Sequence, residues 1–419
     1  MRDRIPSEGK AGRVLLTPEN GEAPFYAIME MADDPIDVGT PPTKAYLLTD
    51  EAEAALFGSP ADRSVNDAFM GISAQLKLIM SDMASITVTV KDHAGNAVKN
   101  VLVGSVYSEN GNAVYTNDSG VATGYIGEGN QTISVKGYAD LADVSKAITV
   151  VKGSTVTETL TPTRKNFLKV TASKSIKFSG NVRTIDASVV GGGSGGEMAV
   201  AAGNDVISGA GGSGGYVVTT DRIEVTANTA YPIVIGAGGK GGGKTSTASA
   251  STGGGASSAF GITANGAAAG SVGVIGGTDA STTLSTAGAG NGAGGRGVNG
   301  RRQADTAGNA GENGKVAAYS SFTETTTYGA GGGSGGTGRA GGGTGGTEGG
   351  GAGGAGGLSG SSSIRIGADA TANTGSGGGG GGGYVQFSDD WNEYEGPGGN
   401  GAAGVVTMRI HFDFGDLAE

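Results

Sequence analysis

The pattern of apolar and polar positions divides the chain into three zones, and the first covers residues 1–84. Six prolines punctuate its start, and after Thr43 the sequence becomes rich in alanine, leucine and glutamate. Proline disfavours helix interiors, so extended chain is expected to give way to helices at 43–57 and at about 63–83. In the second segment, apolar residues recur at alternating spacings of four and three: Val65, Phe69, Ile72, Leu76, Ile79 and Met83. This seam fits either a short coiled coil or one amphipathic helix packed on a surface.

The second zone, residues 85–163, alternates apolar and polar positions with a period of two. Ile86, Val88 and Val90 are apolar and the residues between them are polar, which predicts a half-buried strand. Turn signals follow at 92–96, 109–112, 117–120 and 128–130. Short strands at such regular spacing predict an antiparallel β-sandwich of about 80 residues.

This zone also resembles a known module. The run from Ile86 to Val98, the run from Asn117 to Tyr125, and Gly137-Tyr138 resemble carboxypeptidase-regulatory-like immunoglobulin-type domains. Those modules are usually spacers or lie close to carbohydrate, so the resemblance implies a stalk without chemistry of its own.

The third zone, residues 164–419, begins and ends with strand-like sequence. Strands are expected at 167–170, 175–178 and 182–190, and apolar residues alternate again from Val406 to Phe414. Between these ends lies a tract that holds most of the glycine, because 71 of the 87 glycines follow residue 190. The bracketing strands could pair with each other.

Within the tract, the residues that are not glycine often recur at every third position. Ala210, Ser213 and Tyr216 are one such series, and other series follow further along. A period of three is typical of the extended polyproline-II type of helix, which has no internal hydrogen bonds. Its N–H and C=O groups must therefore bond neighbouring helices when buried, and glycine permits the close approach that this requires. The alternative is a disordered linker, but the threefold phasing and the strand-like run at 231–235 favour order.

The predicted fold is therefore mainly β. An extended and helical segment (1–84) precedes an immunoglobulin-like sandwich (85–163), and a C-terminal glycine-rich domain (164–419) follows. We expect that domain to consist of packed polyglycine-II-type helices bracketed by β-strands. Only Pro232 and Pro397 occur after residue 190, which excludes a collagen triple helix.

Composition excludes several functions. The chain has no cysteine, so disulfides, zinc-thiolate sites and thiol catalysis are ruled out. The net charge is −11 and no zone is strongly basic, which argues against nucleic acid as a partner. No apolar run is long enough for a membrane span, so no membrane insertion is expected.

Catalytic and cofactor motifs are weak. Residues 238–245 fit the phosphate-loop pattern G-x-x-x-x-G-K-[ST], but the sequence after Thr245 lacks the apolar stripe of the helix that such a loop must open. Only His93 and His411 are available for histidine chemistry, so a serine–histidine–aspartate triad is not expected. We predict no catalytic residues, no cofactor and no metal site, and therefore no enzyme.

Recognition is the remaining candidate activity. The polar stretches 271–285, 299–328, 359–376 and 384–395 interrupt the glycine runs and should form loops at the ends of the rods, where recognition residues are commonly placed. The last of these stretches combines aromatic residues with acids and amides, a combination that suits sugar rings or a protein surface. The same residues would also fit an acidic hairpin that packs on its own tryptophan. The carboxylates of this stretch could also form the catalytic pair of a glycosidase or bind calcium, but a solvated run of charges is the commoner case. The candidate receptor-binding residues are Asp389, Asp390, Trp391, Asn392, Glu393, Tyr394, Tyr319, Phe322 and Tyr328.

Over most of its length the chain resembles bacteriophage tail fibre and receptor-binding proteins. Residues 1–21 and 39–48 look like the tail-attachment segment of such proteins. The stretches 185–193 and 401–410, with the glycine tract between them, are similar to their glycine-rich tip domains and to the polyglycine adhesins at the fibre tips of T-even phages.

This resemblance implies a virion protein made in the host cytoplasm, homotrimeric, in which residues 1–84 contact phage tail or baseplate proteins. Loops of residues 164–419 would bind a polysaccharide or an outer surface protein of the host. Two other functions stay open: a structural tail component without receptor contact, and a depolymerase that cuts surface polysaccharide.

Overall fold

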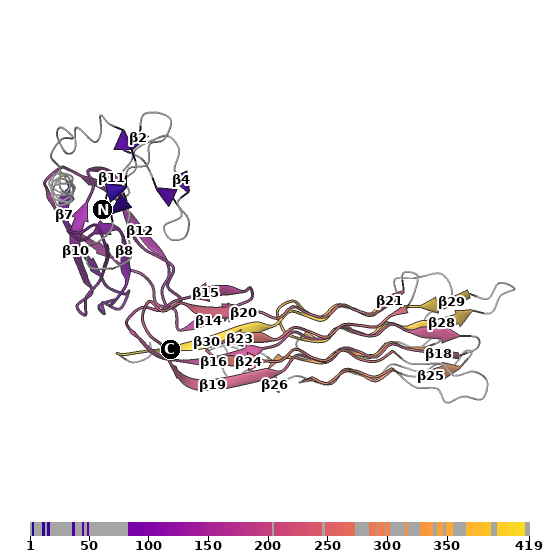
Figure 1. The fold of residues 1–419 in the computed structure, drawn as a ribbon. Coiled ribbons are helices and arrows are strands. Elements are labelled where there is room, and N and C mark those ends of the chain that lie inside the picture. Colours follow the sequence, from indigo (N-terminus) through magenta and orange to yellow (C-terminus); the bar gives the residue numbers. More distant parts are fainter. Residues whose placement is uncertain are drawn as a thin grey trace.

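The computed structural model describes two β-rich bodies (Figure 1). The described residues are 83–202, 205–244, 248–272, 285–290, 292–297, 299–301, 315–316, 327–337, 342–346, 349–354, 366–386 and 392–414, together with six two-residue strands before residue 50. None of these residues lies in a helix, and this part of the chain therefore offers no helix that could cross a membrane. The expectation of a mainly β protein is confirmed.

The two-residue strands pair locally near the N-terminus: β1 (Arg2–Asp3) with β3 (Leu15–Leu16), β2 (Ala11–Gly12) with β6 (Leu48–Thr49), and β4 (Ile36–Asp37) with β5 (Lys44–Ala45). The helix expected at 43–57 is wrong at its start, because β5 and β6 are extended there. Pairing with partners earlier in the chain overrides the local helix propensity. The rest of that helix and the helix expected at 63–83 lie outside the described residues, apart from Met83.

The second zone forms a domain of seven strands, the β7–β13 domain. The strands are β7 (Ala84–Val90), β8 (Leu102–Tyr107), β9 (Ala113–Tyr115), β10 (Val121–Ile126), β11 (Gly129–Val135), β12 (Val144–Val150) and β13 (Thr155–Leu160). Alternate residues of β7 are buried, as the period of two predicts. They enclose one core that also includes Ile126, Ile133 and Leu160.

The strand connections of this domain differ from the expected antiparallel sandwich. The strands follow one hydrogen-bonded path, β12-β11-β8-β10-β7-β13, and β13 runs parallel to β7. The bend lies in β8, where Ser105 has a φ of 68° and where single residue pairs join β8 to β10 and to β11. The two ends of the path, β12 and β13, contact each other, so the bent sheet closes around its core.

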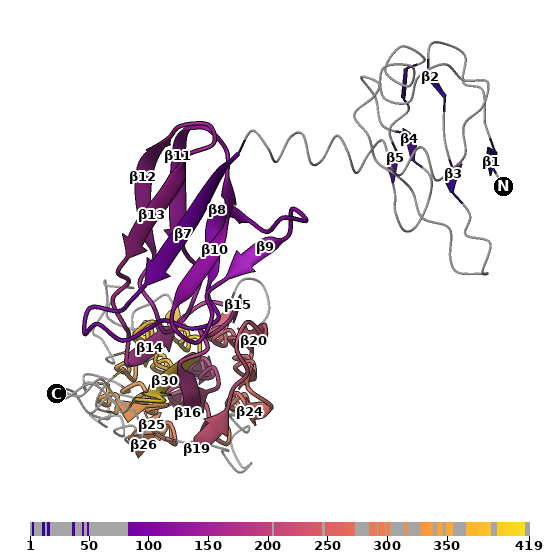
Figure 2. The same cartoon turned by 90° about the vertical axis from the view of Figure 1, so that its left-hand side faces the viewer.

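Residues 164–419, which we call the head, start from a base of two packed four-stranded sheets (Figure 2). One sheet has the order β14 (Phe167–Val170), β30 (Val405–Phe412), β16 (Val182–Val190), β19 (Val217–Glu224). The other has the order β15 (Lys174–Ile176), β20 (Tyr231–Val234), β23 (Ser257–Ala259), β24 (Ile262–Ala264). The apolar side chains of both sheets share one core, and the expected pairing of the bracketing strands is confirmed between β16 and β30.

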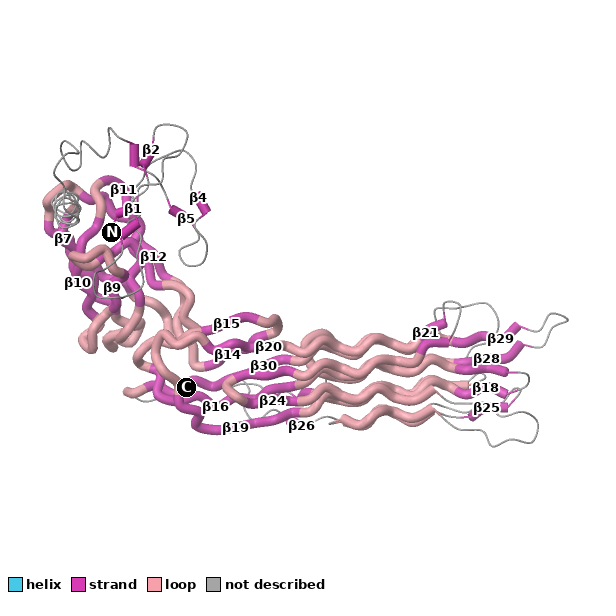
Figure 3. Tube along the Cα trace, in the orientation of Figure 1, coloured by secondary structure: helices cyan, strands magenta, loops and turns pink. Residues whose placement is uncertain are grey.

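From the base, glycine-rich segments run side by side to the far end of the head, which we call the tip (Figures 1 and 3). Residues 191–199 leave β16 toward the tip, and 208–216 bond to them in antiparallel order and return to β19. Residues 375–382 run out to the tip, and 396–404 return to β30. We refer to these packed segments as the lattice.

Hydrogen bonds in the lattice have a threefold repeat, which is clearest in the buried central segment 191–199. Successive N–H groups donate to three different neighbours, and successive C=O groups accept from three more. Donation to segment 208–216 joins Gly191 to Tyr216, Ser194 to Ser213 and Glu197 to Ala210, at 2.8 to 2.9 Å. The central segment thus has six neighbours, and most of its backbone groups are bonded although they are out of reach of water.

Glycine is required here because the backbones approach one another closely. A Cβ placed on Gly196 would lie 2.1 Å from the carbonyl oxygen of Gly379, a distance that no real methyl group tolerates. Gly196 does not have a left-handed φ, so the conformational freedom of glycine is not the reason for its presence. Ala210 and Ser213, at the threefold positions seen in the sequence, are fully buried where the lattice leaves room for a small side chain.

The expectation of packed threefold rods is met in part. The described lattice residues are assigned neither to helices nor, between base and tip, to strands, so the polyglycine-II-type helices expected from the sequence are not seen as such. What is observed is a set of extended segments joined by hydrogen bonds, in which successive residues bond different neighbours and the pattern repeats every three residues.

Candidate functional site: the tip of the head

Short strands close the lattice at the tip. They are β17 (Val200–Ala202), β18 (Asp205–Ile207) and β25 (Asn299–Arg301) in one sheet, the hairpin of β21 (Gly243–Lys244) with β22 (Ala248–Ser249), and the hairpin of β28 (Gly383–Gln386) with β29 (Asn392–Glu395). β17 contacts both β28 and β29, and β18 contacts β28. Segments that are far apart in the sequence therefore end together, at the opposite end of the head from its base (Figure 1).

Three of the candidate receptor-binding residues lie in this tip. Asn392, Glu393 and Tyr394 belong to β29, and Tyr394 is paired with Tyr384 across the hairpin. Asp389, Asp390 and Trp391 belong to the connection between β28 and β29 and lie outside the described residues, as do Tyr319 and Phe322.

Tyr328 does not belong with them. It ends strand β27 (Thr327–Tyr328), which pairs with β26 (Lys315–Val316), and its side chain is only 3% exposed. Its ring packs with Val190 and Val405 where the base sheet meets the lattice, and the Lys169 ammonium lies 5.7 Å from the ring centroid. Tyr328 is therefore a structural residue of the base, and burial of its apolar ring explains its position better than contact with a receptor.

Buried polar side chains hold the lattice together below the tip through hydrogen bonds that the sequence pattern does not predict. The Ser213 hydroxyl bonds the Gly288 carbonyl oxygen, and the Ser194 hydroxyl accepts from the Ser213 N–H at 2.9 Å. The Glu197 carboxylate is 1% exposed and accepts hydrogen bonds from the N–H and the hydroxyl of Ser251, at 3.1 and 2.5 Å. A lone glutamate that follows a glycine run was the only signal in the sequence.

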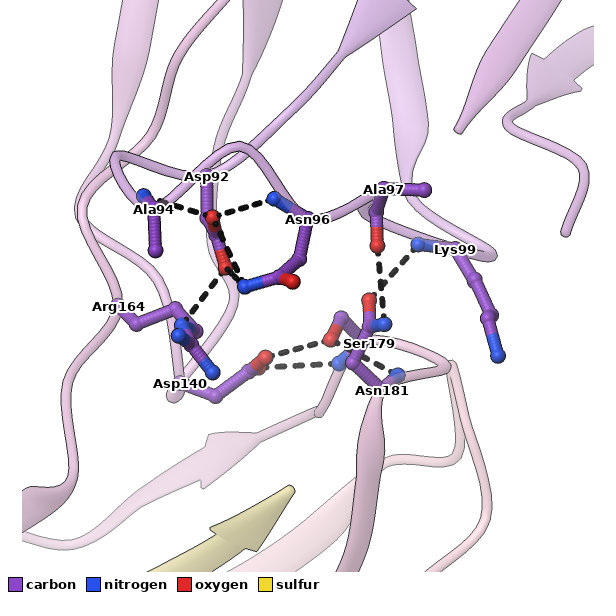
Figure 4. A network of polar contacts seen from close by, with 9 residues as sticks. All are labelled: Asp92, Ala94, Asn96, Ala97, Lys99, Asp140, Arg164, Ser179 and Asn181. Carbon is purple, nitrogen blue, oxygen red and sulfur yellow. Dashed lines mark hydrogen bonds and ion pairs between the residues drawn. The ribbon is translucent and has the colours of Figure 1, made fainter. Parts of the chain in front are cut away.

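The base of the head is fastened to the β7–β13 domain by a network of polar contacts (Figure 4). The Asn181 side chain accepts from the Lys99 N–H at 2.8 Å and donates to the Ala97 carbonyl oxygen at 3.0 Å. The buried Asp140 carboxylate accepts from the Ser179 N–H and hydroxyl, at 3.0 and 2.5 Å. Each bond links residues far apart in the sequence, so the network fixes the direction in which the head leaves the domain.

Electrostatics of this junction follow from burial. Asp92 and Arg164 form an ion pair of 2.7 Å whose side chains are almost fully buried. Burial raises the pKa of Asp140 above its ordinary value, and the hydrogen bonds from Ser179 oppose that rise. Burial also raises the pKa of Tyr138 to about 12, and its hydroxyl accepts from the Leu102 N–H while it donates to the Asn228 side chain of the head.

A family model described as a glycine-rich domain matches residues 170–411, which is more than half of the chain. The chain belongs to this glycine-rich domain family. The matched residues start at the last residue of β14 and end in β30, so the family's domain takes in most of the base together with the lattice and the tip.

Two solved structures show weak similarity to the chain. The Bacillus anthracis TIE protein is 20% identical over 26% of this chain and 22% of its own, with a TM-score of 0.17. A DUF3823 family protein from Parabacteroides merdae is 13% identical over 37% of this chain and 90% of its own, with a TM-score of 0.15. No curated protein matches the sequence.

In the glycine-rich domain, His411 and Asp186 form a buried pair beside a bulge of the base sheet. His411 Nε2 lies 2.7 Å from Asp186 Oδ2, and Asp186 Oδ1 accepts from the Arg222 N–H at 2.8 Å, where β16 bulges. The Ser188 hydroxyl lies 3.3 Å from the Thr219 hydroxyl. The described residues hold no group of three or more acidic or histidine side chains that could bind a metal.

The phosphate-loop pattern also has another role in the glycine-rich domain. Its Gly238, Gly239 and Gly241 pack against lattice neighbours, and Lys244 lies in β21. A strand, not a helix N-terminus, follows the glycines, so the geometry that would bind phosphate is missing at Lys244.

Proposed function

We propose that this protein is a bacteriophage tail fibre or tip protein that binds a host-cell surface receptor through the tip of its glycine-rich domain. In this proposal residues 1–84 attach to the virion tail and the β7–β13 domain is the spacer. The assembly is a homotrimer carried on the virion. Its task is binding, not catalysis.

The observation that supports the proposal is the position of the chain reversals, which gather at the tip. A lattice of backbone hydrogen bonds carries β17, β18, β21, β25, β28 and β29 to one end of the molecule, opposite to the end that joins the spacer. Short segments on a rigid support are a good basis for recognition, because little conformational entropy is lost when they bind. Three tips in one trimer would add avidity, since the first contact tethers the others.

Binding to cells tests this proposal. Labelled wild-type protein should decorate a susceptible host strain, and unlabelled protein should block phage adsorption. The double variant Trp391→Ala with Tyr394→Ala should reduce decoration by about tenfold or more, because buried aromatic anchors commonly carry most of the binding energy. The matched control is Tyr107→Ala with Tyr115→Ala, which removes two exposed aromatic side chains of the spacer and should leave decoration unchanged.

Three other results would contradict the proposal. Decoration that survives the tip substitutions but is lost with the spacer substitutions would place the contact in the β7–β13 domain. Reducing ends released from host capsule or cell wall by the purified protein would indicate a depolymerase. Absence of decoration on every strain that the phage infects would leave a purely structural tail component.

A further inference from the structure

The base of the head carries a pocket that lies at the opposite end from the tip. It has a volume of about 460 Å³ and is formed by β19, β20 and the hairpin of β23 and β24. Tyr231 and Phe260 supply its aromatic wall, Ile262 adds apolar surface, and Glu224, Ser258 and Thr263 supply polar groups. This volume and this mixture of apolar wall and few polar groups are typical of small-molecule sites.

The aromatic wall is held rigidly from behind. The ring centroids of Tyr231 and Phe260 lie 5.4 Å apart, and the ring of Phe178, which is fully buried, lies 6.0 and 6.3 Å from them. The Tyr231 hydroxyl is fixed as well, since it accepts from the Thr226 N–H at 2.7 Å. Both rings that line the pocket are therefore positioned before any ligand arrives.

The backbone at Phe260 is a second observation that points to a ligand. Phe260 and Gly261 form the two-residue turn between β23 and β24, with φ values of 51° and 76°. A hairpin turn with positive φ at both positions favours asparagine followed by glycine. A phenylalanine in this conformation is strained, and strained residues concentrate at functional sites. Here the strain places an aromatic ring in the pocket wall.

The charges of the pocket select among ligands. Glu224 is the only charged residue among the described residues that line it, and no cation does so. Aromatic surface suits the apolar face of a sugar ring, while a carboxylate and two hydroxyls suit its hydroxyl or amino groups. A carboxylate without a cation among the lining residues disfavours anionic ligands such as uronic acids and phosphates.

We propose that this pocket binds a pyranose sugar that carries no negative charge, either neutral or amino. The site is independent of the proposed receptor contact, because its residues belong to the base and the receptor-binding residues belong to the tip.

Calorimetric titration of the full chain tests the proposal, with N-acetylglucosamine, glucosamine and glucuronate as probes. The first two should bind saturably, and glucuronate about tenfold more weakly or not at all. The variant Phe260→Asn should keep the turn, because asparagine suits its first position, but should weaken the binding of both sugars by about tenfold or more. Glu224→Gln should reduce the preference for glucosamine over glucuronate.

Tyr216→Ala is the control, because it removes a 40% exposed aromatic ring of the head that does not line the pocket, and it should bind like the wild type. A melting curve of Phe260→Asn that matches the wild type would show that the turn is intact. The proposal is overturned if neither sugar binds saturably up to about 20 mM, a concentration that corresponds to only some 2 kcal/mol of binding free energy. It is equally overturned if the folded Phe260→Asn variant binds as tightly as the wild type. Absence of cell decoration by a protein that still binds the sugars would contradict the proposed function and leave the sugar site standing.

Discussion

The β7–β13 domain and the lattice both have a closely packed interior, but side chains fill the first and backbone fills the second. The core of the first consists of apolar side chains such as Ile86 and Ile133, and its backbone bonds lie in the surrounding sheet. The centre of the lattice consists of backbone segments that are joined to one another by hydrogen bonds. The comparison shows that a protein interior needs close packing and satisfied polar groups, and that large side chains are only one way to achieve both.

The two interiors should differ in what they tolerate. A side-chain core can adjust by rotating its neighbours, so a change in volume is partly absorbed. The lattice cannot adjust in this way, because the atoms next to Gly196 are the backbone carbonyl groups of other segments. One methyl group at the wrong position should therefore damage the lattice more than the loss of a whole side chain damages the β7–β13 domain.

The largest effect is expected from Gly196→Ala. Its Cβ would overlap the Gly379 carbonyl, so the free energy of unfolding of the head should fall by more than about 4 kcal/mol, or the head should fail to fold. Calorimetry and limited proteolysis of the full chain would measure this.

Two other substitutions to alanine serve as controls. A Cβ added to Gly243 would have no described atom within 4 Å beyond its own chain neighbours, and a Cβ added to Gly127 would meet only the flexible Gln131 side chain. Gly243→Ala and Gly127→Ala should change stability by less than about 1 kcal/mol. A head that tolerates Gly196→Ala as well as it tolerates Gly243→Ala would remove close backbone packing as the reason for the glycines.

An intermediate effect is expected from Ile133→Ala in the other interior. Ile133 is fully buried, so its truncation should lower the stability of the β7–β13 domain by about 2–5 kcal/mol. Amide hydrogen exchange, which follows each domain separately, should show faster exchange in that domain and unchanged protection in the lattice. Equal loss of protection in both would mean that the two interiors unfold as one unit.

The smallest effect is expected at the junction, where the two regions meet. Burial raises the folded-state pKa of Asp140 above its unfolded value, so the native state binds the proton more tightly than the unfolded chain does. The charged form consequently destabilises the native state at neutral pH, and this penalty is relieved as the pH falls through the raised pKa toward about 4.

Asp140→Asn should remove this pH dependence while its side-chain oxygen still accepts from the Ser179 N–H. On acidification from neutral pH, the wild type should gain stability relative to the variant, and denaturant titrations at several pH values would measure the difference. A difference that stays constant over that range would show that Asp140 has an ordinary pKa.

The periodicity of the chain was a good guide to its elements and a poor guide to their pairing. The limits of β14 and β16 agree with the expected 167–170 and 182–190, because each is a short apolar run that ends at a turn or at glycine. The parallel pairing of β13 with β7 had no local signal, since strand direction depends on how the chain returns from β12. The extended pairs at β5 and β6 had none either, because their partners lie earlier in the chain.

The candidate sites show the same division. Sequence placed Tyr394 in a polar stretch between glycine runs, and β29 lies at the tip. It also grouped Tyr328 with the candidates, because an aromatic residue beside polar ones gives no indication of burial. The pocket around Phe260 could not be expected, since its walls come from three separate stretches and its turn is recognised only by a positive φ.

The sequence by itself indicated that the lattice is built from backbone: in the glycine runs the other residues often recur at every third position, and the glycines between them permit contact between main chains. Only the tertiary structure decided which segments are neighbours. Each N–H can bond any carbonyl that comes within reach, because the glycine segments have almost no side chains to distinguish one partner from another. The strands of the base supply that distinction, since their apolar side chains fix where each segment starts.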